Sequence, residues 1–157
     1  MKTILLLSGK SETSWLDSAM RLYEDRLERY TSYTRVEIPG LRQTGALTED
    51  QVKEREGDLM LKRVKDSDFL VLLDEKGEEL SSVEFARYLE KRALSATKSI
   101  VFAVGGAFGF PPRLYQRANY RLSLSRMTLP HQLVRLFFLE QLYRANTIIN
   151  GEPYHHI

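Results

Sequence analysis

The sequence predicts an α/β fold in which a parallel sheet is covered by helices on both faces. Short apolar segments alternate with longer segments of helical periodicity through five β–α repeats in 157 residues. The apolar segments are continuously hydrophobic, as is typical of strands buried on both faces of a sheet. The length and the 43% hydrophobic content suit one domain with a substantial core, so we expect residues 1–157 to form a single domain.

The amino-terminal half of the chain provides three of the expected strands. Residues 3–7 and 34–38 are apolar segments that end at Ser8-Gly9 and Pro39-Gly40, and residues 69–73 end at the charged turn 74–77. Apolar residues recur at helical spacing over 13–30, and a thinner apolar stripe runs through the charged segment 48–64. We therefore expect the order strand, helix, strand, helix, strand.

The carboxyl-terminal half continues the same alternation. Ser81 with Glu84 forms a capping box that starts a helix reaching about residue 96. Residues 99–104 form a strand that leads into Gly105-Gly106. Pro111-Pro112 then opens a short helix, residues 120–124 form the fifth strand, and a long helix closes the fold.

The closing helix follows a loop over residues 124–129. We expect Thr128 to cap it and Pro130 to lie in its first turn. Its apolar side chains cover most of its circumference, which predicts burial all round, and a sheet domain of this size can hardly enclose such a helix alone. We therefore expect a homodimer interface. The apolar residues are Leu133, Val134, Leu136, Phe137, Phe138, Leu139, Leu142 and Tyr143.

Composition excludes several classes of protein. There is no cysteine, so disulfides, thiol nucleophiles and thiolate metal sites are absent, as suits a cytoplasmic protein. No apolar segment approaches the ~20 residues needed to span a bilayer, and we expect no membrane association. Six arginines and one acid between Arg113 and Arg144 give this stretch a charge of +5; the rest of the chain carries −3, because the total is +2. This asymmetry suggests either an anionic partner or scattered solvated arginines.

Local motifs give weak signals for chemistry. Ser8-Gly9-Lys10-Ser11 resembles the end of a phosphate-binding loop, but Ile4 stands where its first glycine should be. The glycines of residues 104–109 follow a strand, where α/β proteins bind ligands, and favour a ligand site over a simple turn. No acid lies at a suitable spacing around His131, His155 and His156, so we expect no metal site. No serine or cysteine nucleophile has an evident base partner.

Several short motifs occur together in the carboxyl-terminal part of the chain: Leu129-Pro130-His131, Val134-Arg135, Glu140-Gln141, Tyr143-Arg144-Ala145, Tyr154-His155, Val104-Gly105-Gly106 with Gly109, and Leu122-Ser123-Leu124-Ser125 with Met127-Thr128. In these motifs the chain resembles the RlmH family of ribosomal RNA large-subunit (23S) pseudouridine N3-methyltransferases, in the SPOUT superfamily. Length and element order are compatible over the whole chain. The sequence departs from the family at its end, where His156-Ile157 replaces a common basic residue.

The resemblance implies a SPOUT-type fold with a carboxyl-terminal trefoil knot, a homodimer, and S-adenosyl-L-methionine bound in the knot. It implies that the arginine-rich protein acts on ribosomal RNA in the large subunit or the assembled ribosome, with Arg144, Tyr154 and His155 as catalytic and RNA-binding residues and His155 as the expected proton acceptor. The implied cofactor contacts are Leu73, Gly105, Leu124, Ser125, Arg126, Met127, Thr128 and Leu129.

Two other functions stay open at this point. One is a non-catalytic ribosome-binding or RNA-binding protein that uses the arginine-rich face, since charge alone supplies affinity for RNA. The other is a nucleotide-dependent oxidoreductase, which the missing dinucleotide fingerprint disfavours. Only the methyltransferase function requires saturable binding of S-adenosylmethionine.

Overall fold

A computed structural model describes residues 1–42 and 44–156 and confirms the predicted α/β architecture. The strands are β1 (Lys2–Ser8), β2 (Ser32–Ile38), β3 (Phe69–Glu79), β4 (Ser99–Val104) and β5 (Tyr120–Ser123). The helices are α1 (Ser14–Leu27), α2 (Glu49–Leu61), α3 (Ser82–Leu94), α4 (Pro112–Arg117) and α5 (His131–Ile149), with a 3-10 turn at Thr44–Ala46.

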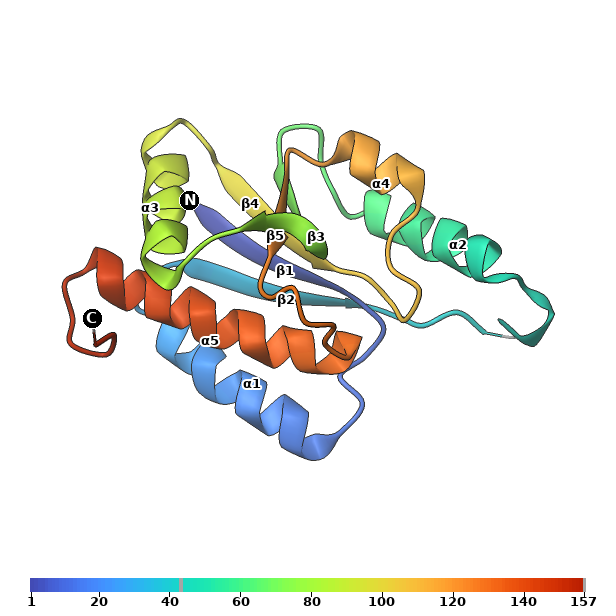
Figure 1. The fold of residues 1–157 in the computed structure, drawn as a ribbon, viewed down its shortest axis with the longest axis horizontal. Helices are drawn as coiled ribbons and strands as arrows, with labels where there is room; N and C mark the ends of the chain where they lie inside the picture. The colour runs from blue at the N-terminus through green and yellow to red at the C-terminus, as the bar shows by residue number, and fades with distance from the viewer. Residues whose placement is uncertain (43, 157) are drawn as a thin grey trace.

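The five strands form one sheet in the order β2-β1-β4-β3-β5, and every neighbouring pair is parallel. Figure 1 shows the helices lying on both sides of this sheet. The carboxyl ends of all five strands therefore lie at the same edge of the sheet. The three strands with continuous apolar segments, β1, β3 and β4, lie inside the sheet, and most residues of these segments are buried.

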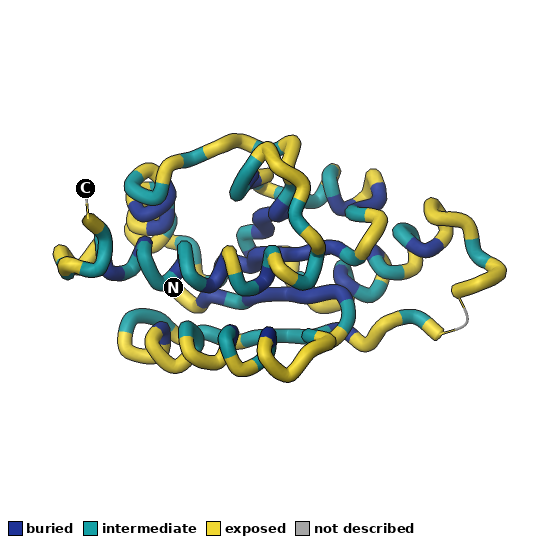
Figure 2. The backbone as a smooth tube through the Cα atoms, turned by 60° about the horizontal axis from the view of Figure 1, so that its bottom comes forward, coloured by how far each residue is buried: buried dark blue, intermediate teal, exposed yellow. Residues whose placement is uncertain are grey.

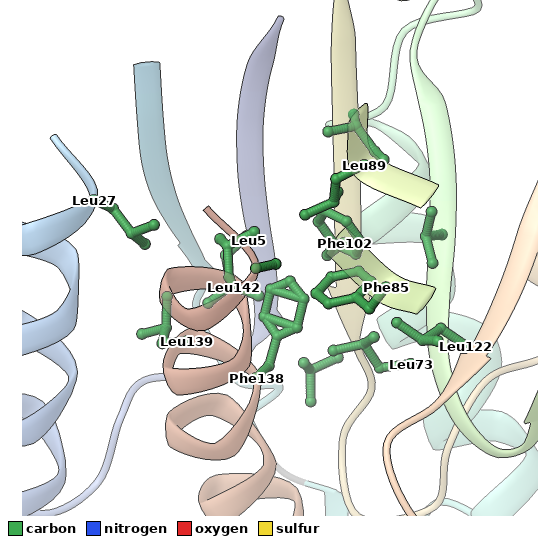
Figure 3. Close-up of a cluster of buried hydrophobic side chains, with 14 of the residues drawn as sticks. Leu5, Leu27, Leu73, Phe85, Leu89, Phe102, Leu122, Phe138, Leu139 and Leu142 are labelled. Atoms are coloured by element: carbon green, nitrogen blue, oxygen red, sulfur yellow. The ribbon is translucent and has the colours of Figure 1, made fainter. Parts of the chain in front are cut away.

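Two clusters of buried apolar side chains lie between the sheet and the helices that cover it, one on each face. The larger cluster packs α1, α3 and α5 against one face, and its centre is Phe102 of β4, which meets Phe138 of α5 and Phe85 of α3 (Figure 3). The smaller cluster packs Met60 of α2 and Leu114 of α4 against the other face. Figure 2 shows buried residues along the strands and exposed residues on the outer sides of the helices. Helices thus shield both faces, as the continuously apolar strands require.

Strand β3 is longer than the sequence predicts. The charged residues after Leu73 were expected to end the strand, but it continues to Glu79 through a register shift between Leu73 and Glu78. Glu78 and Glu79 pair with Leu122 and Ser123 of β5 beyond this irregularity. An irregularity of this kind changes the direction of a strand. Residues 74–79 are mostly exposed, so charged side chains are tolerated there.

Two helix starts can be compared with the prediction. The capping box of Ser81 and Glu84 is present at α3, and a second box, Thr48 with Gln51, starts α2. The prediction that Thr128 caps α5 is wrong: Pro130 occupies the N-cap position, and the Thr128 hydroxyl donates to Glu75 Oε2 at 2.8 Å. Thr128 is two residues too early for a cap, so its hydroxyl serves the loop instead.

Within one chain, helix α5 is buried on only part of its circumference. The sequence predicted that its apolar side chains would be buried all round, with a partner subunit covering what one domain cannot enclose. The helix lies between α1 and α3, where Phe138, Leu139 and Leu142 are buried, but Leu133 and Phe137 remain 38% and 37% exposed. A stretch of apolar surface is therefore left on this helix. Within the described parts of the chain, no helix combines the length and apolar character needed to cross a membrane.

Candidate functional site

A cavity of about 620 Å³ opens at the carboxyl edge of the three neighbouring strands β4, β3 and β5. It is enclosed by the ends of these strands, the loop after β5 and the first turn of α5. Seven of the eight residues that the sequence singled out for a cofactor line this cavity: Leu73, Gly105, Leu124, Ser125, Met127, Thr128 and Leu129. Adjacency of the strands, which the sequence does not reveal, brings these distant residues together.

Arg126 is the predicted cofactor residue that does not line the cavity. Its side chain is 83% exposed and its Nε lies 3.2 Å from Oε1 of Glu79. The Arg126 side chain therefore does not border the cavity in this structure, and its contact with a cofactor stays a prediction. The residues on either side of it, Ser125 and Met127, do border the cavity.

Local hydrogen bonds fix the loop that forms one wall of the cavity. The Ser123 hydroxyl donates to the carbonyl of Ser125 at 3.0 Å, and the Ser125 hydroxyl accepts from the Met127 amide at 3.0 Å. The bond from Thr128 to Glu75 ties the far end of the loop to β3. Short side chains that bond their own backbone shape such turns. The loop therefore has a defined form before any ligand arrives.

The opposite wall depends on glycine. A Cβ built on Gly105 would lie 3.2 Å from the carbonyl group of Gly109 and 3.3 Å from the Phe110 ring. The chain turns sharply here, because the Gly109 amide donates to the carbonyl of Gly106 at 3.1 Å and Gly109 has a φ of +83°. A side chain at Gly105 would therefore crowd the turn, and the bare backbone there also lets a ligand approach closely.

Other residues of the cavity were not predicted to bind a cofactor. They are Asp74, Glu75, Val104, Gly106, Ala107, Phe108, Gly109, Phe110, Tyr115, Pro130, His131 and Val134. The glycine-rich stretch 104–109 gave a positional signal for several of them. Asp74 and Glu75 directly follow the apolar segment 69–73, and the sequence therefore placed them at the expected carboxyl end of a strand, where parallel sheets bind ligands. Burial raises the pKa of Tyr115 to about 12, so this phenol stays neutral.

The other predicted site residues, Arg144, Tyr154 and His155, form a cluster with Glu140 at the far end of α5. Glu140 Oε1 accepts from Arg144 Nε at 3.1 Å, from Arg144 Nη2 at 2.6 Å and from the Tyr154 hydroxyl at 3.0 Å. The remaining Arg144 nitrogen, Nη1, lies 3.0 Å from His155 Nδ1. The Arg144 guanidinium also lies over the Tyr154 ring at 4.8 Å. One carboxylate therefore organises the cluster.

The tail that carries this cluster is folded back onto the domain. The Glu152 amide donates to the Thr147 carbonyl at 2.9 Å, and Gly151 adopts the positive φ of +68° expected for a turn. Glu152 also accepts from the Tyr30 hydroxyl at 2.7 Å. The chain thus turns at Gly151 and returns to the domain, whereas Ile157 lies outside the described residues.

Electrostatics keep two members of the cluster protonated. The hydrogen bond with Glu140 raises the pKa of the Arg144 guanidinium, which stays cationic at all relevant pH values. Burial, followed by the hydrogen bond to Glu140, raises the pKa of the Tyr154 phenol well above its usual value. Neither group can accept a proton near neutral pH. Tyr154 acts here as a donor to Glu140.

The cavity and the cluster do not meet within one chain. Val134 borders the cavity near the start of α5, and Arg144 lies ten residues further along the same helix. A rise of 1.5 Å per residue separates these two positions by about 15 Å. A single subunit therefore presents the two groups of predicted residues as separate surfaces.

The arginines of the carboxyl-terminal third do not form one face. Arg113 on α4 pairs with Glu54 and Asp58 of α2, and Arg117 donates to the carbonyls of Lys65 and Asp68. Arg135 is completely buried. Of the two alternatives left open by the charge asymmetry, these contacts favour scattered arginines over a single basic face. Among the described residues, no three His, Asp or Glu side chains converge as a metal-binding set.

Comparison with known proteins identifies the family of this chain. The family model described as "Predicted SPOUT methyltransferase" matches residues 1–155. The chain belongs to the SPOUT methyltransferase family. Among its relatives, the protein named "Ribosomal RNA large subunit methyltransferase H" from Christiangramia forsetii is 47% identical over 97% of each chain. Proteins of the same name from Parabacteroides distasonis and Bacteroides fragilis are 46% and 44% identical over 99% of each chain.

The match to the family model covers nearly the whole chain, including most of the tail after α5. The match reaches residue 155 and so covers both the cavity and the Glu140 cluster. The family resemblance recognised from the carboxyl-terminal motifs is thereby confirmed.

Proposed function

We propose that this protein transfers a methyl group from S-adenosylmethionine to N3 of a pseudouridine in large-subunit ribosomal RNA. The observation that carries the proposal is the cavity at the ends of β3, β4 and β5, lined by seven residues at the positions of the family's cofactor motifs. Family membership and the names of relatives 44% to 47% identical support the same activity. The proposed substrate places the reaction in the cytoplasm.

The cavity suits S-adenosylmethionine in size and chemistry. A volume of about 620 Å³ lies within the usual range for small-molecule sites, and Leu73, Leu124 and Leu129 offer apolar walls for a purine. Gly105 presents bare backbone for polar contacts. Asp74 and Glu75 border the cavity with negative charge, which favours a ligand that carries a sulfonium and an ammonium group. The bound sulfonium supplies an already activated methyl donor, so no metal ion is needed.

The cluster of Glu140, Arg144, Tyr154 and His155 offers groups that can bind the target base and stabilise its negative charge. Loss of the N3 proton leaves negative charge on the pyrimidine, and a fixed cation such as Arg144 stabilises it. Arg144 is held by Glu140 and is therefore preorganised. Tyr154 and His155 lie beside it and complete a polar surface for a base that has left its stack.

A homodimer would bring the cavity and the cluster together. Exposed apolar side chains lie on the neighbouring helices α1 and α5, namely Trp15 and Leu22 on α1 and Leu133 and Phe137 on α5. A two-fold axis across α5 near Leu139, midway between Val134 and Arg144, would set Arg144 of one protomer beside the cavity of its partner. The site we propose is therefore shared between two subunits, which also explains the apolar surface.

We further propose that α5 passes through the chain in a trefoil knot. The carboxyl-terminal part of β3, which leads to α3, crosses the path from β5 to α5 in Figure 1, and Glu78 and Glu79 pair with Leu122 and Ser123 of β5. Arg126 pairs with Glu79, Thr128 with Glu75, and the Ser82 hydroxyl donates to Gln141 Oε1 at 2.6 Å. We infer that after the edge strand β5 the chain passes beneath this part of β3 to reach the place of α5, which contacts both α1 and α3.

The activity can be tested with tritiated S-adenosylmethionine and purified ribosomes. The full chain should place label on large-subunit RNA, and nucleoside analysis should identify N3-methylpseudouridine. Ribosomes whose RNA keeps uridine at the target position should accept no label. A chain that lacks residues 154–157 should bind the cofactor normally in calorimetry but transfer no methyl group. Saturable ribosome binding without label from any substrate would instead support a non-catalytic ribosome-binding protein.

A further inference from the structure

We propose that His155 acts in the reaction as a hydrogen-bond donor through Nε2–H, not as the base that removes the N3 proton. The inference rests on the proposed methyltransferase function and assigns a role within that site. It is carried by the contact of His155 with Arg144 and by the way Glu140 holds Arg144 in place.

The contact with Arg144 fixes the tautomer of His155. Arg144 Nη1 lies 3.0 Å from His155 Nδ1, and a guanidinium has only donors. Nδ1 must therefore be the acceptor and carry no proton, which leaves the proton of the neutral ring on Nε2. The outward nitrogen of the ring is then a donor. A base would need the opposite arrangement, with a free lone pair on Nε2.

A proton cannot be taken up at Nδ1 without cost. Protonation there would replace the hydrogen bond by a contact between two cations at 3.0 Å. Arg144 cannot move away easily, because its Nε and Nη2 both donate to Glu140 Oε1. Glu140 is itself restrained: its Oε2 accepts from Gln141 at 2.8 Å, and Gln141 accepts from Ser82 of α3. A chain of hydrogen bonds thus runs from α3 to the imidazole.

A donor at this place suits the chemistry of the target base. N3 of pseudouridine lies between two carbonyl groups, and its deprotonation spreads negative charge onto their oxygens. In the proposed step the N3–H proton goes to solvent water. The N3 electron pair then forms a bond to the methyl carbon of S-adenosylmethionine. The bond between that carbon and the sulfonium sulfur breaks, and its electrons stay on sulfur. His155 Nε2–H and the Arg144 cation would stabilise the carbonyl oxygens, as donors do in an oxyanion hole.

Two amide substitutions separate the roles. In His155→Gln the amide nitrogen stands near the position of Nε2 and can donate, but an amide cannot serve as a base. In His155→Asn the amide group stands near Nδ1 and reaches no substrate. His156→Gln changes an exposed neighbour and serves as the control. Each full-length variant is assayed with ribosomes under single-turnover conditions, after calorimetry has shown normal binding of S-adenosylmethionine.

We expect His155→Gln to keep a rate within about tenfold of wild type, and His155→Asn and His155→Ala to lose roughly 10²-fold or more. The rates of wild type and His155→Gln should rise in parallel with pH, because both depend on ionisation of N3. Equal inactivity of the glutamine and alanine variants, or a titration near pH 6.5 seen in wild type and absent from His155→Gln, would overturn the donor role. Absence of methyl transfer by wild type would refute the proposed function itself.

Discussion

Arg135 shows how a single residue can connect two distant parts of this fold. It is 0% exposed, and its Nη2 donates to the carbonyl of Ser8 at 2.8 Å while Nη1 donates to the Ser11 hydroxyl at 3.2 Å. Glu37 of β2 supplies the counter-charge at 3.6 Å. This arginine fastens the loop after β1 to the start of α5, next to the cavity. An arginine in so apolar a helix therefore serves the core and not an RNA surface.

Removal of Arg135 should destabilise the domain. Arg135→Ala leaves the Ser8 carbonyl and Glu37 without their partner and opens a cavity, so we expect the free energy of unfolding to fall by about 3–5 kcal/mol. Arg126→Ala, which removes an 83% exposed side chain, should change it by less than about 0.5 kcal/mol. Urea unfolding followed by circular dichroism measures both. Equal stability of the two variants would mean that Arg135 is not energetically coupled to its partners.

Gly105 tests the cavity wall at the same scale. A Cβ at Gly105 would press on Gly109 and Phe110, so Gly105→Ala should shift the turn. We expect the affinity for S-adenosylmethionine to fall roughly tenfold, which corresponds to a loss of about 1.4 kcal/mol in binding free energy. A larger side chain such as valine would disturb the turn as well as the ligand and so give a less specific result. Gly40→Ala adds a methyl group in open space and is the matched control. If calorimetry gives both variants the affinity of the wild type, the cofactor does not bind beside Gly105.

At the scale of elements, the sequence predicts existence and order well but boundaries and exposure less well. Every strand and helix expected from periodicity is present, because the pattern reflects burial in a parallel sheet. The extension of β3 to Glu79 could not be predicted, since its charged residues pair only through β5, a strand distant in sequence. The exposed side of α5 was hidden for a similar reason: an apolar residue looks the same whether it faces the core or a partner.

This distinction decides which residue tests the dimer. Phe138 is 0% exposed and packs on Phe102, so a charge there would unfold the chain and report nothing on assembly. Phe137→Glu places the charge on the exposed side of α5 and should give a folded monomer in sedimentation velocity at micromolar concentration. Leu94→Glu, at an 84% exposed position on α3, should remain dimeric. A wild-type monomer, or a dimeric Phe137→Glu with unchanged affinity, would exclude this interface.

At the scale of the whole molecule, local patterns cannot show which distant segments meet. Leu73 lies in β3 just before its register shift, and Gly105 and Leu124 directly follow β4 and β5; only the strand order β4-β3-β5 makes these residues neighbours. The proposed threading of α5 is equally invisible to periodicity, since unthreaded connections are the general rule. Family resemblance supplied these expectations, because it transfers a three-dimensional arrangement along with the residues. The separation of the tail cluster from the cavity required the structure itself.

That separation makes a prediction about pairs of subunits. One variant lacks residues 154–157 and so has no Tyr154 or His155, and a second carries Ala107→Trp, which fills the mouth of the cavity from an exposed position. Each should be inactive alone, the first with normal cofactor binding and the second with none. Co-expressed with different affinity tags and purified through both, they form dimers that contain one intact cavity and one intact tail, on different subunits.

Such mixed dimers should transfer methyl groups at about half the wild-type rate per dimer if the site joins the cavity of one protomer to the tail of its partner, because one of two composite sites is complete. If each site lay within one protomer, both sites of the mixed dimer would be defective and no label would reach ribosomal RNA. Tritiated-methyl incorporation by the doubly purified dimers, beside wild-type dimers carrying the same tags, separates the two arrangements. Inactive mixed dimers would require α5 to deliver Arg144 to its own cavity, against the roughly 15 Å of helix that lies between them.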